Sequence, residues 1–191
     1  MRLREHIKYG SVASLLSLRF LGPWYALIFW LASVLIDVDH YIDYVYRTGG
    51  TDWRVASIFR LDHFLRQKLQ RGELQGRLVC LSLFHTVECF SLIYLAFLWT
   101  GSVFWLAVFY GMAFHLFLDV VALAGCRALF VRAFSLIEYV VRRRIMKARG
   151  MNPDEVWIAA FKTIGVKHRS LRGPRFAVTS EPDAVRESFE I

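Results

Sequence analysis

The feature that most constrains the fold of this chain is a run of 49 residues, 78–126, without a Lys or Arg. Two acidic residues, Glu88 and Asp119, are the only charges in it. A membrane-spanning helix needs about 20 predominantly apolar residues, so the run has room for two. The whole chain is 56% hydrophobic, which is above the roughly 45–50% of soluble domains. The first prediction from the sequence is therefore a membrane protein.

A Thr-Gly-Ser turn signal divides this run into two predicted helices, 78–99 and 103–124. Residues 127–149 then alternate apolar side chains with arginines, which is typical of a basic amphipathic helix on a membrane surface. Residues 150–191 are polar and are expected to form a tail with some local helix around 153–164.

Near the N-terminus, the turn signal Gly22-Pro23 separates two shorter apolar segments, 9–21 and 24–36. At about 1.5 Å per residue, each segment is too short to cross the hydrocarbon core by itself. Two interpretations are open at this point. The segments form a helical hairpin that enters the membrane and returns, or the second helix continues to about Tyr46 and spans the membrane.

The positive charges indicate how the chain is oriented. The net charge is +8, and Lys and Arg lie in three blocks, within 1–8, 47–77 and 127–191, with Arg19 as the exception. Cytoplasmic loops of membrane proteins carry such an excess. A hairpin places all three blocks on one side, whereas a single span would place one of the first two outside. We therefore expect a multi-pass protein of the cell inner (cytoplasmic) membrane, with both termini in the cytoplasm.

The same sequence disfavours other classes of protein. No nucleic-acid-binding motif accompanies the basic charge. We therefore expect the partner to be membrane lipid and expect no binding of nucleic acid. A cleaved signal peptide is not expected, because Arg19 interrupts the first apolar run and no A-x-A site follows. The three cysteines lie in apolar sequence without a C-x-x-C motif and are expected to be reduced.

Polar residues inside the apolar helices are the candidate functional residues, because placing them in a membrane is costly. His115 and Asp119 are four residues apart and share one helical face, where they can bind one metal ion or bridge two. The alternative is a hydrogen-bonded pair that only holds helices together. His85 and Glu88 lie in the preceding helix. A lone buried His is more often a core residue, but a carboxylate there needs a partner such as a cation.

A third group lies where the apolar segment 24–36 ends. Asp37, Asp39 and His40, followed by Asp43, supply four potential ligands within seven residues. Asp and His together suit a hard or borderline divalent ion. The alternative is an acidic helix end that lies in solvent.

Histidines outside these groups complete the candidates. His6 precedes the first apolar segment, His63 lies in the basic loop 47–77 as a weaker candidate, and His168 is expected to be solvated. In the hairpin topology the main candidates all fall in the cytoplasmic half of the membrane or at its surface. One metal takes about four to six ligands, so the set suggests two ions. The predicted metal ligands are His6, Asp37, Asp39, His40, His85, His115 and Asp119.

Four short motifs follow one another along residues 1–126: His-x-x-x-Gly, Leu-Ile-Asp-x-Asp-His, a His-Thr helix start, and His-x-x-x-Asp followed by Gly125. Their order resembles that of the membrane-bound metal-dependent hydrolases of the YdjM type, which are similar in ligand pattern to zinc-dependent phospholipases C. The resemblance implies that the seven predicted ligands form the site. In that family a His-Arg pair commonly precedes a Thr-His-Ser run, whereas here Phe84 precedes His85 and the assignment of His63 and Glu88 stays open.

We expect metal-assisted hydrolysis of a phosphoester, either a small molecule or lipid-linked, at the cytoplasmic face. We expect the cofactor to be a divalent metal, zinc, and the number of ligands allows two ions to bind. Asp37 or Asp39 would bridge the metals, and Glu88 with Asp39 would be the catalytic carboxylates. The rival functions are a metal-ion or proton transporter and a non-catalytic membrane adaptor. Two principal spans are few for a transporter, and an adaptor leaves the clustered His and Asp unexplained.

The expected architecture is an all-α, polytopic transmembrane helical bundle with a basic amphipathic C-terminal segment. Its three predicted parts are a membrane-embedded metal-site domain over 1–126, an interfacial helix over 127–149 and a cytoplasmic polar tail over 150–191. No feature of the sequence indicates an oligomeric state.

Overall fold

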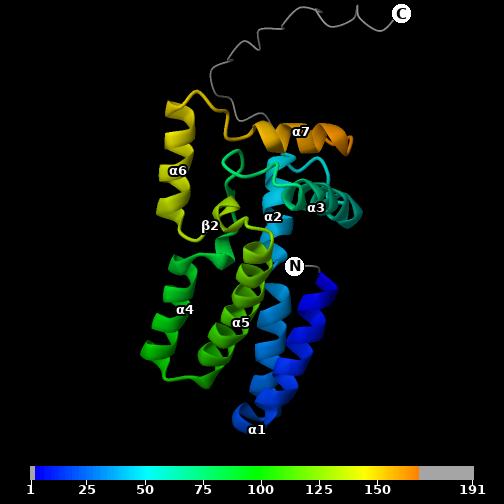
Figure 1. Cartoon of the computed structure of the whole chain (residues 1–191). Helices are drawn as coiled ribbons and strands as arrows, with labels where there is room; N and C mark the ends of the chain where they lie inside the picture. The colour runs from blue at the N-terminus through cyan, green and yellow to red at the C-terminus, as the bar shows by residue number, and fades with distance from the viewer. Residues whose placement is uncertain (1–2, 168–191) are drawn as a thin grey trace, which may run out of the picture.

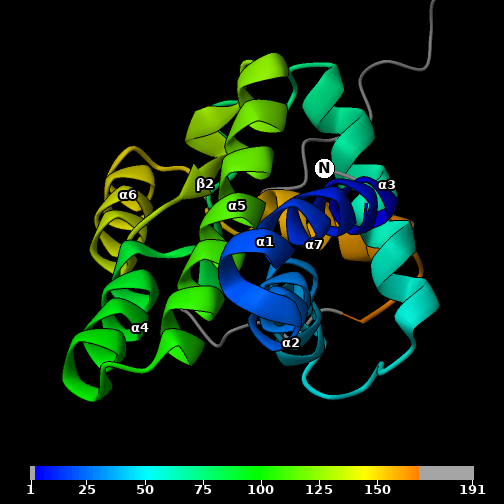
Figure 2. The ribbon, with the colours of Figure 1, turned by 90° about the horizontal axis from the view of Figure 1, so that it is seen from below.

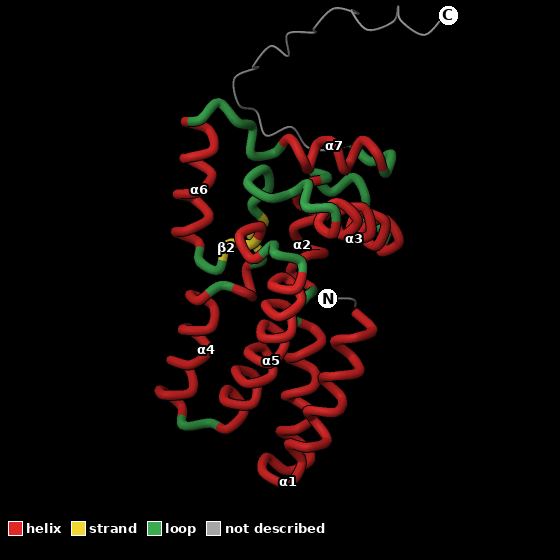
Figure 3. Tube along the Cα trace, in the orientation of Figure 1, coloured by secondary structure: helices red, strands yellow, loops and turns green. Residues whose placement is uncertain are grey.

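The structure is a computed structural model that describes residues 3–167 of the 191 in the chain. The described part is mostly helical, with two strands of two residues each and connecting loops (Figure 3), which confirms the predicted all-α class. The candidate His168 lies outside the described residues. Figure 1 shows two tiers of helices, with the N-terminus between them. The lower tier consists of α1 (Leu3–Leu35), α4 (Val87–Thr100) and α5 (Val103–Gly125), and the upper tier of α2 (Val38–Arg47), α3 (Val55–Gln70), α6 (Leu136–Ala148) and α7 (Glu155–Thr163).

The element α1 is a helical hairpin, as the first interpretation of the N-terminal segments predicts, and α2 then continues the chain to Arg47. Its helix is interrupted at Gly22, whose φ of 72° lies in the left-handed region that glycine adopts without strain. Pro23 follows and suits the start of the second arm, because a helix leaves its first N–H groups unpaired. The indole Nε1 of Trp30 in the second arm donates a hydrogen bond of 3.0 Å to Ser11 Oγ in the first. The arms therefore run antiparallel, and both ends of the hairpin lie beside the upper tier (Figure 1).

A second hairpin, formed by α4 and α5, packs beside the first. Its turn contains Gly101, with a φ of 64°. The predicted helix over 103–124 is confirmed by α5. The view from below places α5 between α4 and α1 (Figure 2), in agreement with its contacts to both helices. α4 has 14 residues, which corresponds to a length of about 21 Å.

The predicted helix over 78–99 is wrong in its first part. α4 begins only at Val87, because Thr86 takes the N-cap position and its Oγ1 accepts a hydrogen bond of 3.3 Å from the N–H of Cys89. The residues before Thr86 form a short strand and a 3₁₀ turn that are held among the upper helices. These two elements are β1 (Cys80–Leu81) and η1 (Leu83–His85).

The predicted amphipathic helix over 127–149 is also shorter than expected, since α6 starts at Leu136. The segment before it forms a 3₁₀ turn, η2 (Leu129–Val131), and a strand, β2 (Arg132–Ala133). β2 pairs in parallel with β1, with Cys80 opposite Arg132. α6 stands above α4 in Figure 1 and is seen end-on in Figure 2, so it is aligned with the hairpins rather than laid across them.

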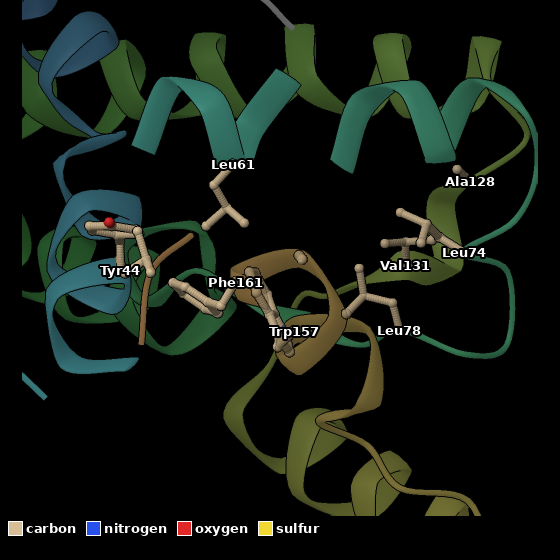
Figure 4. Packing of buried hydrophobic residues seen from close by; sticks show 10 residues of the cluster. Tyr44, Leu61, Leu74, Leu78, Ala128, Val131, Trp157 and Phe161 are labelled. Atoms are coloured by element: carbon tan, nitrogen blue, oxygen red, sulfur yellow. The ribbon is translucent and has the colours of Figure 1, made fainter. Parts of the chain in front are cut away.

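The upper tier has a hydrophobic core of its own (Figure 4). The expected local helix over 153–164 is confirmed by α7, but its inner face is buried rather than part of a solvated tail. The segment 47–77, predicted to be a loop, contains α3, which contributes Leu61 to the same core. The buried members of this core are Tyr44, Leu61, Leu74, Leu78, Ala128, Val131, Trp157, Ala160, Phe161 and Val166.

The lower tier exposes a large apolar surface. By length and composition, two helical stretches, Arg4–Arg47 and Val103–Gly125, could cross a membrane, but the first turns back at Gly22 and only Val103–Gly125 is a single uninterrupted helix of that length. Near the two hairpin turns, the side chains of Phe20 and Trp99 are 83% and 90% exposed. Apolar surfaces of this extent mark contact with lipid or with a partner. The lower tier therefore exposes an apolar surface that suits contact with lipid or with a partner.

Candidate metal centre

The seven predicted ligands come together at the boundary between the two tiers. Each lies within ion-pair distance of at least one other member of the set. Both ends of the α1 hairpin, the η1 turn and the upper part of α5 meet there, so residues far apart in the sequence become neighbours. The seven are His6 from α1, Asp37 from the α1–α2 junction, Asp39 and His40 from α2, His85 from η1, and His115 and Asp119 from α5.

Four of them form the tightest group. One donor atom each from Asp37, His85, His115 and Asp119 lies within 4.8 Å of the other three. His115 Nε2 is 3.2 Å from Asp37 Oδ1 and 3.7 Å from Asp119 Oδ2. His85 Nε2 is 3.6 Å and 3.8 Å from the same two oxygens. Ligand atoms about 2.0 Å from a tetrahedral zinc ion stand about 3.3 Å from one another. The four donor atoms therefore could hold a metal ion with little movement.

The hydrogen bonds of the two imidazoles aim their free nitrogens at this group. His115 Nδ1 lies 2.7 Å from the carbonyl oxygen of Ser33, and His85 Nδ1 lies 3.1 Å from Asp39 Oδ2. Both partners are acceptors, so each Nδ1 carries a proton, and in a neutral ring each Nε2 then carries the lone pair that binds a metal. Among the described residues, neither of these buried Nε2 atoms has a hydrogen-bond partner. Metal-binding histidines characteristically have this arrangement.

The protonation of His85 fits the same conclusion. Burial lowers the pKa of His85 to about 4, and the hydrogen bond to Asp39 only partly opposes this. The imidazole is therefore neutral near pH 7. Neutral imidazole is the form that binds a metal.

Asp39 is placed where it orients His85. Its Oδ2 accepts hydrogen bonds from the Phe84 N–H at 2.9 Å and from His85 Nδ1. Its Oδ1 is buried without a hydrogen bond among the described residues. Asp39, which with Asp37 is one of the two alternatives for a residue that bridges two metals, thus has one oxygen committed to orienting His85.

A second group of potential ligands consists of Asp39, His40 and His85. It shares His85 with the first group, and a neutral imidazole has one lone pair. The two groups therefore compete for His85 unless its second proton is also lost. His40 is the most exposed of the histidines in the cluster, with 37% of its side chain accessible, and its Nδ1 lies 3.2 Å from Ser82 Oγ.

His6 lies behind the tightest group. Its ring stacks on that of His115 with centroids 3.9 Å apart, and its Nε2 is 3.2 Å from Asp119 Oδ1. The side chain is 1% exposed. In this position His6 donates to the second oxygen of Asp119 and holds the carboxylate in place.

Arg132 is a member of the cluster that the sequence analysis missed. Its Nη1 donates to Asp119 Oδ2 at 2.7 Å, and its Nη2 lies 3.3 Å from His40 Nε2. The sequence predicts a surface helix over 127–149, in which an arginine would face solvent. The available signal was the isolation of Arg132 within the otherwise apolar sequence 128–134.

Glu88, predicted to be a catalytic base, has its contacts elsewhere. Its Oε1 accepts hydrogen bonds from the Ser135 hydroxyl and, at 3.0 Å, from the N–H of Leu136. These contacts cap the start of α6 and give Glu88 a structural role. His63 is also apart from the cluster, since its Nε2 pairs with Gln67 on the exposed side of α3.

The charges of the cluster are unbalanced. Three carboxylates, from Asp37, Asp39 and Asp119, face one guanidinium, from Arg132. With neutral imidazoles, two negative charges remain in a largely buried space. Buried charges of one sign are paired or coordinate a metal, so a divalent cation suits this site.

Comparison with protein-family models, curated proteins and solved structures finds no match to this chain. The resemblance to the YdjM-type hydrolases thus remains a prediction from the motifs.

Proposed function

We propose that this chain is a membrane-embedded, metal-dependent hydrolase that cleaves a phosphoester at the cytoplasmic face of the cell inner membrane. The observation that carries the proposal is the pair of buried Nε2 atoms, from His85 and His115, that face two carboxylates at 3.2–3.8 Å and have no hydrogen-bond partner among the described residues. A pair that only held helices together would satisfy both nitrogens of each ring.

The donor set favours zinc. Asp37, His85, His115 and Asp119 would hold the ion, since imidazole and carboxylate are its usual ligands. When bound, such an ion lowers the pKa of its water and stabilises charge on phosphoryl oxygens. Hydrolysis then adds the water oxygen to phosphorus, breaks the P–O bond to the alcohol and leaves the water proton on the alcohol oxygen. His40, at the exposed side of the cluster, is the group placed to transfer that proton.

The lower tier supports insertion in a membrane. Trp24 and Trp99 lie within two residues of the hairpin turns and are exposed, as tryptophans at a membrane–water interface are. Arg19 lies near the first turn, where its charge can reach the same interface. The turns would then mark the outer interface, and the upper tier with its basic segments would lie on the cytoplasmic side.

The interior of the lower tier favours a hydrolase over a transporter. A transport path needs polar groups from the cluster to the hairpin turns. Instead Phe29 of α1 and Ala107 and Met112 of α5, all apolar, are buried on the side of the cluster toward the hairpin turns. An adaptor, the other rival, does not require the buried unpaired nitrogens.

Metal analysis of the purified full-length protein tests the proposal. We expect bound zinc in the wild type and hydrolysis of p-nitrophenyl phosphate. Asp119→Asn should lose both, because a carboxamide cannot balance a divalent cation. Asp62→Asn is the matched control, since Asp62 pairs with Arg66 on α3 outside the cluster. Normal zinc content in Asp119→Asn would refute ligation by Asp119, and a wild type that binds no metal would refute the hydrolase.

A further inference from the structure

We propose that Arg132 binds the phosphoryl oxygens of the substrate beside the metal site. This inference rests on the proposed function, because it names the group that recognises the substrate of the same site. The ligand chemistry is a phosphate monoester or diester with at least one anionic oxygen. Three observations support the assignment: the fixed position of Arg132, its place at the open side of the cluster, and N–H donors that have no partner among the described residues.

The backbone of Arg132 is held in a defined position. β2 pairs with β1, so Arg132 lies opposite Cys80. Cys80 is three residues before the start of η1, the turn that carries His85. From the other side, Arg142 donates to the carbonyl oxygens of Arg132, at 3.2 Å, and of Phe130. Arg142 is itself held by Glu138 at 3.0 Å. The guanidinium is thus supported as a binding group needs to be.

Exposure divides the cluster into a closed and an open side. His85 and His115 are fully buried, with exposed fractions of 0%. The side chains of Asp37, His40 and Arg132 are 27%, 37% and 12% exposed. A ligand that reaches the four donor atoms therefore enters beside these three residues. Asp37 repels an anion, and a neutral His40 does not attract one. Arg132 is the one that carries a permanent positive charge.

The donors of Arg132 match an oxyanion. A guanidinium has five N–H groups in a planar fork that suits phosphate and carboxylate. The Nη1 contact to Asp119 Oδ2 and the Nη2 contact to His40 Nε2 account for two of them. The contact to Asp119 also shows that the guanidinium of Arg132 lies close to the four donor atoms. A phosphoryl oxygen bound at those atoms would therefore lie within reach of Arg132.

A lipid phosphate is the source that the geometry favours. His115 lies 13 residues beyond Ser102, about 20 Å along the helix, and the hydrocarbon core is about 30 Å thick. With the turn at the outer interface, the cluster lies in the inner leaflet. Exposed apolar side chains also continue past the cluster, from Leu35 at the end of α1 to Val38 and Ile42 of α2.

The test measures binding of inorganic phosphate to the full-length, zinc-loaded protein by ³¹P NMR, together with steady-state hydrolysis. The variants are Arg132→Gln, which removes the charge, and Arg132→Lys, which keeps the charge without the fork. Arg144→Gln is the control, because Arg144 is an exposed arginine of the neighbouring α6. We expect Arg132→Gln to weaken phosphate binding and raise KM about 10- to 100-fold, with zinc content unchanged. Arg132→Lys should recover part of this loss, and Arg144→Gln should match the wild type.

Two esters identify the source: phosphatidic acid in mixed micelles and glycerol 3-phosphate in water. If Arg132→Gln hydrolyses both esters less well than the wild type, Arg132 has a phosphoryl-binding role. The ester with the larger wild-type kcat/KM identifies the source of the phosphate. Unchanged phosphate affinity in Arg132→Gln overturns the inference even when hydrolysis by the wild type upholds the proposed function. Absence of zinc from the wild type refutes the proposed function separately. Absence of phosphate binding to zinc-loaded wild type overturns the inference.

Discussion

Gly111 of α5 lies directly against the backbone of Phe29 in α1, since a Cβ atom at position 111 would stand 2.4 Å from the Phe29 carbonyl oxygen. Four residues further along each helix, the same close approach brings Ser33 O within 2.7 Å of His115 Nδ1. The contact between the two hairpins therefore sets the tautomer of a predicted ligand. Close helix approach and metal binding are coupled through one hydrogen bond.

Gly111→Ala should separate α1 from α5 and weaken both stability and metal binding. The backbone oxygen cannot move aside as a side chain could, so a cost of about 1–3 kcal/mol is expected. Gly125→Ala, at the end of the same helix, is the control, because nothing lies within 4 Å of its added Cβ. Thermal unfolding in detergent and zinc content measure the two effects. Equal unfolding temperatures for the two variants would contradict the coupling.

Asp39→Asn separates an orienting role from a bridging role. If Asp39 orients His85, the variant should bind zinc about 10- to 100-fold more weakly but reach the wild-type stoichiometry at saturation. If Asp39 bridges two ions, the number bound at saturation should fall. Zinc titration of the full-length protein distinguishes these results. Asp43→Asn is the control on the same helix, because Asp43 pairs with Arg47 at 2.7 Å instead of joining the cluster.

Glu88→Gln should leave zinc content and hydrolysis unchanged while lowering the unfolding temperature. The amide loses the charge that accepts hydrogen bonds from Ser135 and Leu136, so the start of α6 is capped less well. Ser135→Ala removes the hydroxyl from the same contact and should lower the unfolding temperature as well. A loss of hydrolysis in Glu88→Gln without a loss of stability would restore the catalytic assignment that the sequence suggested.

The parts of the site that the sequence predicts correctly depend on local geometry. A spacing of four residues places His115 and Asp119 on one helical face, and Gly22-Pro23 encodes the turn of the first hairpin. Glu88 shows where this reasoning ends. A carboxylate in an apolar run needs a partner, but the sequence does not say that the partners are a hydroxyl and an N–H group 47 and 48 residues away.

Pairing between residues far apart in the sequence also explains why the predicted helices over 78–99 and 127–149 are shorter in the structure. The pairing of β1 with β2 joins residues 80 and 132, and periodicity within either segment does not predict it. Because the pairing is not visible in the sequence, the sequence predicts Arg132 to lie in a surface helix. The apolar residues before Thr86 raise the same difficulty, because a run buried by protein and a run that faces lipid have similar compositions.

Trp157→Ala should show that the upper tier supports the metal site from a distance. Trp157 is buried in the core of this tier, and the Arg47 guanidinium at the end of α2 lies 4.3 Å from its ring centroid. Since α2 also carries Asp39 and His40 in its first turn, loosening its far end should disturb the cluster.

A buried aromatic replaced by alanine costs about 3–5 kcal/mol, so Trp157→Ala should lower the unfolding temperature and the zinc retained on purification. Ile158→Ala is the matched control, because Ile158 is the next residue of α7 and is 44% exposed. It should leave both quantities near the wild type. The decisive comparison is zinc content at a temperature where both variants are folded. Full zinc content in Trp157→Ala under that condition would mean that the cluster is held by the hairpins and η1 without support from α7.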